Sequence, residues 1–415
     1  MIGKGISGII SFVVSIILAK ALGVVGYGDF TKITTYVAFF YLFCDFGLNA
    51  GYLQLAAGQV SSTLRHSLLT LRVCIGLILM FITMMLLMVL PGTVNQGYSH
   101  VVKIGIILFI PSILCQSLIT TANVFFQERL RYELATYALI SGSLLTLIMV
   151  YVSSLFFSST LFLFAFVTAN LLGLVTTTLV AIILVKKTIG SLRFMWNPLE
   201  TKLLFLSALP LGITLIFNVI YFHADSFILT ITRSTSEVGI YGLAYKFFEF
   251  TLVIPTFFMN AALPLLIKDY SQKNTEVFHA RITKSLWLLI LTSITVAAVG
   301  WRATTLLHYI RPEFTPSSIP LKILLLGLPF FYISNITMWI LVIKKLRVQL
   351  VSIYGISMIV NILLNIYFIP IYGYMAAAWI TVISEFFIVF SSYIVIARNA
   401  VTKQSRNEIA SLRSQ

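Results

Sequence analysis

Seven ionisable side chains are the most informative among those inside stretches of this sequence that are long and apolar enough to cross a membrane. They are Lys32, Asp45, His223, Asp225, Lys246, Glu249 and Glu385. A charge at the centre of a bilayer costs roughly 2.5–3.5 kcal/mol on insertion scales, so these groups should face a polar interior or one another. Their chemistry is that of charge pairing, anion binding and ion transfer.

The two lysines among these groups, Lys32 and Lys246, can be interpreted in two ways. Lys246 and Glu249 are three residues apart, so on a helix they share a face and neutralise one another in part. One interpretation places Lys32 and Lys246 as paired cations facing a central cavity. The other is that each charge is matched by a neighbour and serves helix assembly, or that Lys32 snorkels to the membrane interface.

The remaining groups admit the same two interpretations. His223 and Asp225 form either a proton relay or a structural pair. Asp45 and Glu385 serve either ion coupling or charge pairing within the helix bundle.

No pattern in the sequence is typical of an enzyme. There is no glycine-rich phosphate loop followed by Lys and Ser or Thr, and no cluster of His, Cys and acidic residues has metal-ligand spacing. Cys44, Cys74 and Cys115 lie in apolar runs and are expected to be small buried hydrophobes without a disulfide. We therefore predict no catalytic residue, no metal and no cofactor.

Composition determines the elements that must position these groups. With 59% hydrophobic and 10% charged residues, the chain has too little polar surface to fold as one soluble globule. Because the apolar runs are long and lack strand-like alternation, we predict an all-α polytopic membrane protein whose first helix is retained. About twelve transmembrane helices are expected, at 2–22, 30–56, 67–90, 101–126, 132–157, 160–185, 203–231, 238–267, 283–309, 319–343, 348–370 and 373–397.

The net charge of +15 is mostly a topology signal. With a cytoplasmic amino terminus, twenty Lys and Arg residues fall on the cytoplasmic side and six on the other, which places both termini in the cytoplasm. No basic soluble domain is present that would favour nucleic acid as a partner.

Two short internal matches indicate a repeat. Gly239-Ile-Tyr241-Gly242 with Lys246 resembles Gly26-Tyr27-Gly28 with Lys32, and Leu346-Arg347 with Leu350 resembles Leu130-Arg131 with Leu134, at offsets of 214 and 216. An offset spanning six helices predicts two parallel halves around a central cavity. The predicted divisions are 1–185, a basic cytoplasmic linker at 186–202, 203–397 and a cytoplasmic tail at 398–415.

At these residues the sequence resembles the oligosaccharidyl-lipid flippases of the polysaccharide biosynthesis type, which include O-antigen flippases and belong to a superfamily with multidrug exporters and the lipid II flippase. The resemblance covers most of the chain. It rests on three stretches: Leu22-Gly23-x-x-Gly26-Tyr27-Gly28 with Asp45-x-Gly47-Leu48; Ala224-Asp225 through Glu237-Val-Gly239-Ile-Tyr241-x-x-Ala244-Tyr245-Lys246; and Asn361-x-x-x-Asn365-x-x-x-Ile369-Pro370-x-x-Gly373-Tyr374-x-x-Ala377-Ala378.

The resemblance implies a flippase that carries undecaprenyl-diphosphate-linked oligosaccharide across the bacterial inner membrane by alternating access. Lys32 and Lys246 are then the candidates for the diphosphate, and Asp225 and Glu249 for coupling to an ion gradient. A polysaccharide polymerase and a chain-length regulator are implied partners. Many members carry Arg after the Asp of the second stretch, whereas this chain has Ser226.

Two other functions remain open at this point. A cation-coupled multidrug exporter on the same fold would place carboxylates in the first half, yet residues 1–22 contain no Asp or Glu. A non-transporting membrane assembly protein would tolerate neutralisation of the intramembrane charges.

The topology is testable with reporter fusions. Reporters after Gly190 and after Lys403 should both read cytoplasmic, while one near Ser317 should read external, because of the twenty-to-six distribution of basic residues. A cytoplasmic signal at Ser317 would contradict the twelve-span arrangement.

Overall fold

The computed structural model describes residues 2–56, 62–156, 159–190, 192–272 and 274–413. Within these ranges the regular structure is helical apart from two isolated β-bridges. The elements are α1 (Ile2–Asp45), α2 (Leu48–Ala56), α3 (Ser62–Val89), α4 (His100–Phe109), α5 (Ser112–Glu128), α6 (Tyr132–Phe156), α7 (Ser159–Ile189), α8 (Pro198–Thr232), α9 (Thr235–Thr251), α10 (Val253–Ser271), α11 (Thr275–Ala303), η1 (Thr304–Leu306), α12 (Leu307–Ile310), η2 (Pro312–Ser317), α13 (Ser318–Ile343), α14 (Arg347–Tyr372) and α15 (Tyr374–Arg413).

The twelve predicted spans coincide with these helices. Ten helical runs among the described residues are long and apolar enough to cross a membrane. The first of them, Gly5–Ala56, contains two predicted spans, and α8 is a further helix of 35 residues. The predicted all-α polytopic fold is therefore confirmed.

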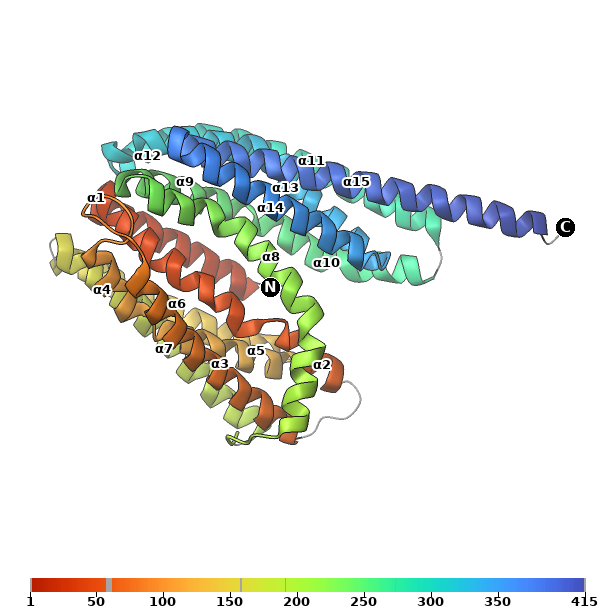
Figure 1. Ribbon diagram of the computed structural model, residues 1–415, viewed down its shortest axis with the longest axis horizontal. Helices are drawn as coiled ribbons and strands as arrows, with labels where there is room; N and C mark the ends of the chain where they lie inside the picture. The colour runs from red at the N-terminus through yellow and green to blue at the C-terminus, as the bar shows by residue number, and fades with distance from the viewer. Residues whose placement is uncertain (1, 57–61, 157–158, 191, 273, 414–415) are drawn as a thin grey trace.

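Helix α1 is two limbs joined at Gly23. Gly23 has φ +69 and ψ −177, a backbone conformation that favours glycine, and it separates residues 2–22 from 24–45. A Cβ here would also lie 2.7 Å from Arg311 Nη1. The chain reverses at this point, so the two limbs run side by side (Figure 1).

Four predicted spans are divided in the structure: that from 30 to 56 between the second limb of α1 and α2, that from 283 to 309 among α11, η1 and α12, and two others near a proline. The span from 101 to 126 is divided into α4 and α5 at Pro111, which has no N–H to continue the helix ladder. The span from 238 to 267 is divided into α9 and α10 at Leu252, three residues before Pro255. A break of this kind changes the direction of the helix inside the membrane.

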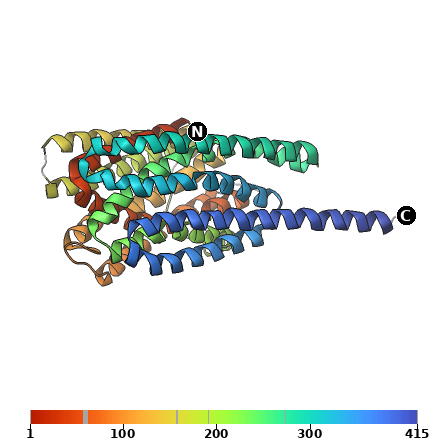
Figure 2. The same ribbon diagram turned by 90° about the horizontal axis from the view of Figure 1, so that it is seen from above.

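The helices form two bundles that diverge from one end of the molecule (Figure 1). Helices α1 to α7 lie in one bundle and α9 to α15 in the other, while α8 packs against α2 at its start and against α14 further along. Seen from above, the end of α15 extends beyond the other helices (Figure 2). Helix α8 thus spans the opening between the bundles.

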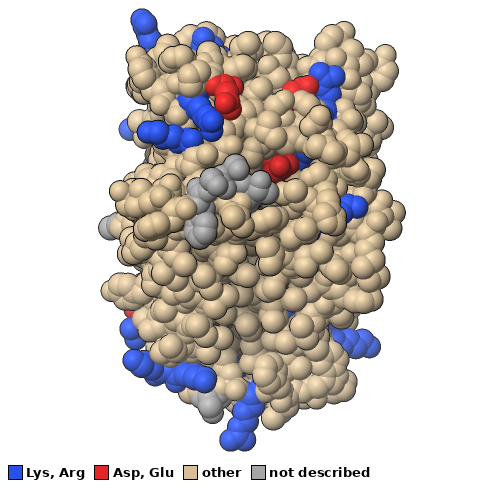
Figure 3. Space-filling view, turned by 90° about the vertical axis from the view of Figure 1, so that its left-hand side faces the viewer, with Lys and Arg blue, Asp and Glu red and all other residues tan. Residues whose placement is uncertain are grey.

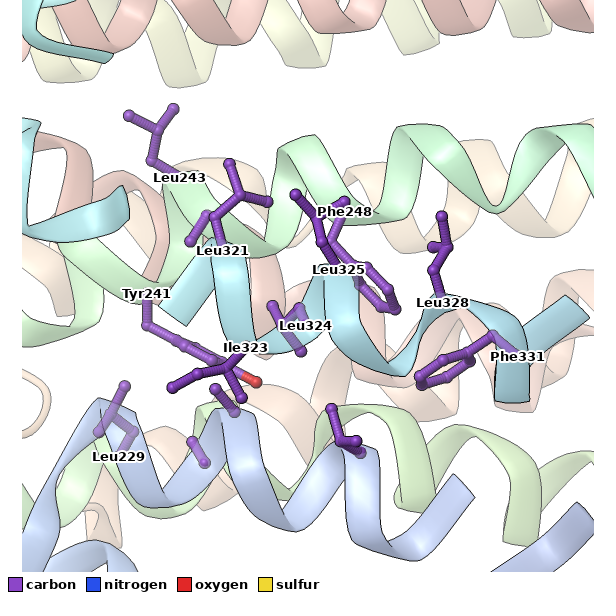
Figure 4. Packing of buried hydrophobic residues seen from close by; sticks show 14 of the residues in the cluster. Leu229, Tyr241, Leu243, Phe248, Leu321, Ile323, Leu324, Leu325, Leu328 and Phe331 are labelled. Atoms are coloured by element: carbon purple, nitrogen blue, oxygen red, sulfur yellow. The ribbon is translucent and has the colours of Figure 1, made fainter. Parts of the chain in front are cut away.

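The carboxy-terminal bundle has a close-packed apolar core between α9 and α13. Tyr241 and Phe248 of α9 lie against Leu324, Leu328 and Phe331 of α13, and each of these side chains is at most 4% exposed (Figure 4). Burying a large apolar side chain contributes about 1.5–3 kcal/mol. This core fixes α9, the helix that carries Lys246, on the rest of its bundle.

Candidate functional site

A cavity of about 290 Å³ lies between the two bundles. Both limbs of α1 and one residue of α7 form one wall, and α8 and α9 form the other. Its lining residues are Ser11, Val14, Ser15, Leu18, Tyr27, Phe30, Thr31, Thr34, Thr35, Ala38, Asn170, His223, Ser226, Gly242, Tyr245, Lys246 and Glu249. The wall is thus mostly hydroxyl-bearing and small side chains inside a protein that is otherwise strongly apolar.

The hydroxyls on α1 follow helical spacing. On the second limb, Tyr27, Thr31 and Thr34 are four and three residues apart and all line the cavity. Thr31 donates to the Tyr27 carbonyl at 2.8 Å, and Thr34 donates to the Phe30 carbonyl at 2.9 Å. The hydroxyls of Thr31 and Thr34 are thus satisfied within their own helix, so this part of the wall is stable without a ligand.

Lys246 and Glu249 lie in the cavity wall and form an ion pair. Lys246 Nζ is 3.0 Å from Glu249 Oε2, and the two side chains are 37% and 51% exposed. They are the charged side chains among the described residues that line this cavity. An ammonium group has three donors, so Lys246 can hold Glu249 and still donate to an anion in the cavity.

His223 and Asp225, two residues apart on α8, have different surroundings. His223 lines the cavity, whereas Asp225 is 3% exposed and turned into the carboxy-terminal bundle. Asp225 accepts hydrogen bonds from the Tyr241 hydroxyl and from the Thr381 hydroxyl, the latter at 3.4 Å. The carboxylate is thus held by hydroxyl groups of α9 and α15.

Glu385 lies deeper in the same bundle. It is 3% exposed and accepts a hydrogen bond from the Tyr221 hydroxyl at 3.0 Å. The preceding residue on α15, Ser384, accepts from the Asn361 amide at 3.0 Å, and Asn361 accepts from Asn365 at 2.8 Å. The bundle interior therefore contains a chain of buried polar groups around two carboxylates.

Asp45 lies outside the cavity, in an ion pair at the end of α1. Arg72 Nη2 donates to Asp45 Oδ1 at 2.8 Å and to Asn49 Oδ1 at 2.7 Å. The Arg72 side chain is fully buried, and the negative charge of Asp45 together with the Asn49 oxygen offsets part of its desolvation cost, while Nε and Nη1 have no hydrogen-bond partner among the described residues. This contact joins α1, α2 and α3.

Lys32 does not line the cavity, although its neighbours Thr31 and Thr34 do. The residue is 1% exposed, and its ammonium donates to the Gly97 carbonyl at 2.9 Å and to the Thr235 hydroxyl at 2.7 Å. Thr235 begins α9, so this contact, here called the Lys32 clasp, joins the two bundles. Lys32 and Lys246 are therefore not brought together in this state.

Further backbone bonds close the same end of the molecule. The Gly97 N–H donates to the Thr230 carbonyl at 2.9 Å, and the Thr235 N–H donates to the Asn95 carbonyl at 2.8 Å. Gly28 permits this contact, since a Cβ there would lie 2.1 Å from the Thr235 carbonyl oxygen. Figure 3 views this end, where uncharged side chains cover most of the surface and acidic side chains lie beside basic ones. The cavity is closed on this side.

Two features of the site were not identified from the sequence. The hydroxyl stripe was detectable as Ser7, Ser11 and Ser15 at intervals of four on the first limb and as the corresponding threonines on the second. Arg72 was not among the predicted site residues, and the structure places it inside α3 with its side chain fully buried. The sequence feature that could have identified Arg72 is Asp45, because an acidic residue in an apolar surrounding needs a cation as a partner.

Two family models match the chain. The model described as "Polysaccharide biosynthesis protein" matches residues 1–269, and the model described as "MatE" matches residues 210–367. The first covers more than half of the chain and confirms the family predicted from the sequence motifs. None of the curated proteins matches the chain.

Solved structures with the same fold are transporters and flippases. The lipid II flippase MurJ in an inward closed conformation is 16% identical, with 95% of this chain and 87% of that chain covered and a TM-score of 0.75. An inward-facing MATE family multidrug resistance transporter of the MOP superfamily is 12% identical, with 96% of each chain covered and a TM-score of 0.76. An outward-facing transporter of that family is 15% identical, with 97% and 94% covered and a TM-score of 0.64. At these identities the likeness establishes the fold, and it agrees with the prediction that the chain is not an enzyme.

The Lys32 clasp predicts a change in access to the cavity. Lys32→Met retains the length of the side chain and removes both donors, so the closed end should open more often. The rate at which a membrane-impermeant thiol reagent labels Ser11→Cys from that end should rise about tenfold, since a hydrogen bond to a charged group is worth about 1.5–3 kcal/mol. The measurement uses a background in which Cys44, Cys74 and Cys115 are replaced by Ala.

Lys103→Met is the matched control. Lys103 also donates to a backbone carbonyl, that of Leu90 at 2.8 Å, but within one bundle. Thr235→Val should act like Lys32→Met, and the double variant should add little to either change. Labelling that is unchanged in Lys32→Met would show that the clasp does not hold this end closed.

Proposed function

The chain belongs to the polysaccharide biosynthesis protein family, and from that membership and the cavity we propose that it translocates a lipid-linked oligosaccharide across the bacterial inner membrane. The substrate is an undecaprenyl-diphosphate-linked unit of O-antigen or a similar surface polysaccharide. The observation that carries the proposal is Lys246, a cation in the wall of a polar cavity between two helix bundles. Polymerase and chain-length regulator are the partners expected to use the product.

Lys246 binds the diphosphate in this proposal. A diphosphate needs a cation once it leaves water, and ammonium-to-phosphate contacts are among the stronger hydrogen bonds. In the empty cavity Glu249 neutralises Lys246, so no net charge stands unpaired between the bundles. The substrate would take over Lys246 from Glu249.

Lys32 binds the same group at another stage of the cycle. In the present state its ammonium is occupied by Gly97 and Thr235. Opening of this end would separate α1 from α9 and free Lys32, which lies one residue from the cavity-lining Thr31. A cation freed only at that stage would receive the diphosphate as it moves toward the other leaflet.

The two bundles, predicted as 1–185 and 203–397, rock against one another around the cavity in this mechanism. The closed end contains the loop at 90–99 and the start of α9, which the distribution of basic residues assigns to the external side. The conformation seen in this structure would then be open toward the cytoplasm, with both termini on that side. The higher TM-score with the inward-facing transporter supports this orientation.

A drug exporter for cations is less well supported by the cavity. The part of α1 that lines it contributes hydroxyl, aromatic and small apolar side chains and no carboxylate. The cationic Lys246 would also repel a cationic drug. An assembly protein without transport activity is separated from the proposal by the Lys246 variants below.

Coupling to an ion gradient is proposed at the carboxylates Asp225 and Glu249, with His223 and Glu385 as further ionisable groups nearby. Asp225→Asn and Glu249→Gln keep the shape and remove titration, so at least one of them should remove the dependence of transport on external pH. Glu133→Gln, at an ion pair with Arg131 near the start of α6, is the control. Retention of the parental pH dependence by both variants would exclude proton coupling through these groups.

Lys246 gives the most direct test of the function. Lys246→Ala should abolish complementation of a flippase-deficient strain, and Lys246→Arg should keep part of it, because the charge remains while the donor geometry changes. Surface glycan is the measurement, with membrane abundance checked by blotting. Lys20→Ala, an exposed lysine outside the cavity, should complement normally.

The double variant Lys246→Ala with Glu249→Ala distinguishes substrate binding from charge neutralisation. If Lys246 only neutralises Glu249, the double variant leaves no unpaired charge and should restore transport. If Lys246 binds the diphosphate, transport stays lost. Full recovery would therefore leave Lys246 as a structural partner and remove the proposed contact.

A further inference from the structure

A second cavity of about 290 Å³ lies within the amino-terminal bundle. Its walls come from α1, α4, α6 and α7. It shares five lining residues with the cavity that contains Lys246: Ser11, Val14, Thr34, Ala38 and Asn170. The second cavity is therefore adjacent to the one that contains Lys246.

The wall of the second cavity is polar but uncharged. Its polar side chains are Ser7, Ser11, Thr34, Tyr41, Ser143, Thr146, Asn170 and Thr177. Lys, Arg, Asp, Glu and His are absent among the described residues that line it. Most of these side chains donate within the protein, so the wall offers mainly hydrogen-bond acceptors and carries no net charge.

These groups are held in place without a ligand. Thr146 donates to the Gly142 carbonyl at 3.1 Å and Thr177 to the Gly173 carbonyl at 3.0 Å, while Ser7 and Ser143 share a hydrogen bond of 2.7 Å between α1 and α6. A hydroxyl that donates to its own helix keeps its acceptor lone pairs, and the Ser7–Ser143 pair can exchange its bond for one to a ligand.

Close packing of α6 on α7 places two cavity-lining threonines against glycines of the facing helix. A Cβ on Gly142 would lie 1.9 Å from Thr177 Oγ1, and a Cβ on Gly173 would lie 1.9 Å from Thr146 Oγ1. The two glycines thus leave room for two hydroxyls at the contact between the helices. If Thr146 and Thr177 served helix packing alone, side chains that carry only methyl groups could fill this contact.

We propose that the second cavity holds the neutral sugar residues next to the diphosphate and so selects neutral over acidic headgroups. This inference rests on the proposed function. A lipid tail would leave the hydroxyls without partners, a cation would find no carboxylate, and an acidic sugar would find no cation. The hydroxyl groups of neutral sugars can donate and accept hydrogen bonds at this wall. Their C–H faces can pack against the rings of Phe109 and Tyr41.

The size of the site agrees with part of a headgroup. Small-molecule sites occupy roughly 300–1,000 Å³, and each cavity is about 290 Å³. Together they suit the diphosphate and the sugars closest to it, while the distal part of the oligosaccharide would extend into the opening between the bundles. The selection thus concerns the linkage-proximal sugars.

The test measures binding to the purified full chain in lipid nanodiscs. The probes are undecaprenyl diphosphate, the same lipid carrying N-acetylglucosamine, and the same lipid carrying glucuronic acid, with dissociation constants from native mass spectrometry. In the parent protein the neutral sugar should strengthen binding about tenfold over the bare lipid, as one or two net hydrogen bonds would. Glucuronic acid should give no such gain.

The variant pair isolates the cavity hydroxyls. Ser143→Ala with Thr177→Val should lose the gain from N-acetylglucosamine and keep the affinity for the bare lipid. Ser154→Ala with Thr176→Val is the matched control, because these hydroxyls also donate to their own helices, α6 and α7, but lie outside the cavity. The control should retain the full gain, and unfolding temperatures of both variants confirm the fold.

The outcomes separate this inference from the proposed function. Equal binding of the sugar-bearing and bare lipids by the parent would overturn the sugar site and leave the flippase proposal standing. Equal loss of the gain in both double variants, or a gain from glucuronic acid as large as that from N-acetylglucosamine, would also overturn it. Absence of binding to every diphosphate lipid would contradict the flippase proposal itself.

Discussion

The cost of charge in an apolar surrounding determines how the polar groups of this protein are arranged. Each of the intramembrane charges meets that cost differently: Lys246 pairs with Glu249, Lys32 uses neutral oxygens, and Asp225 accepts from hydroxyls. A pair of opposite charges neutralises itself, whereas a single charge in an apolar surrounding needs hydrogen bonds from the groups around it. The Lys246–Glu249 pair in the cavity and the Lys32 clasp therefore both reduce the cost of placing charge in an apolar surrounding.

The fold was predictable because a bilayer constrains helix length. A span of about 20 apolar residues is visible in the sequence without any tertiary information, so the predicted segments and helices coincide. The direction of the chain inside a span was not visible. Gly23 reverses the chain at a point where Arg311, far along the sequence, lies close to it, and the break between α9 and α10 falls at Leu252, three residues before Pro255.

The candidate site was only partly predictable, for a related reason. Lys32 and Lys246 occupy corresponding positions in the repeat, yet only Lys246 faces the cavity. The face of a helix that borders a cavity depends on how other helices pack around it, and hydropathy does not identify that face. Thr31 and Thr34 marked the cavity face of α1 by their spacing, but hydroxyls at such spacing also occur where helices only pack.

The pairing of Lys246 with Glu249 also bears on energy coupling. The pair itself has no net charge, so in the proposed mechanism the bundles would rock without moving an unpaired charge at this point through a low-dielectric region. A bound diphosphate would add negative charge next to Glu249, and the two anions would compete for one ammonium group. Protonation of Glu249 would remove that competition and free Lys246 for the substrate. We therefore infer that Glu249, more than the enclosed Asp225, is where proton binding and substrate binding meet, because it alone of the two carboxylates borders the space that the substrate enters.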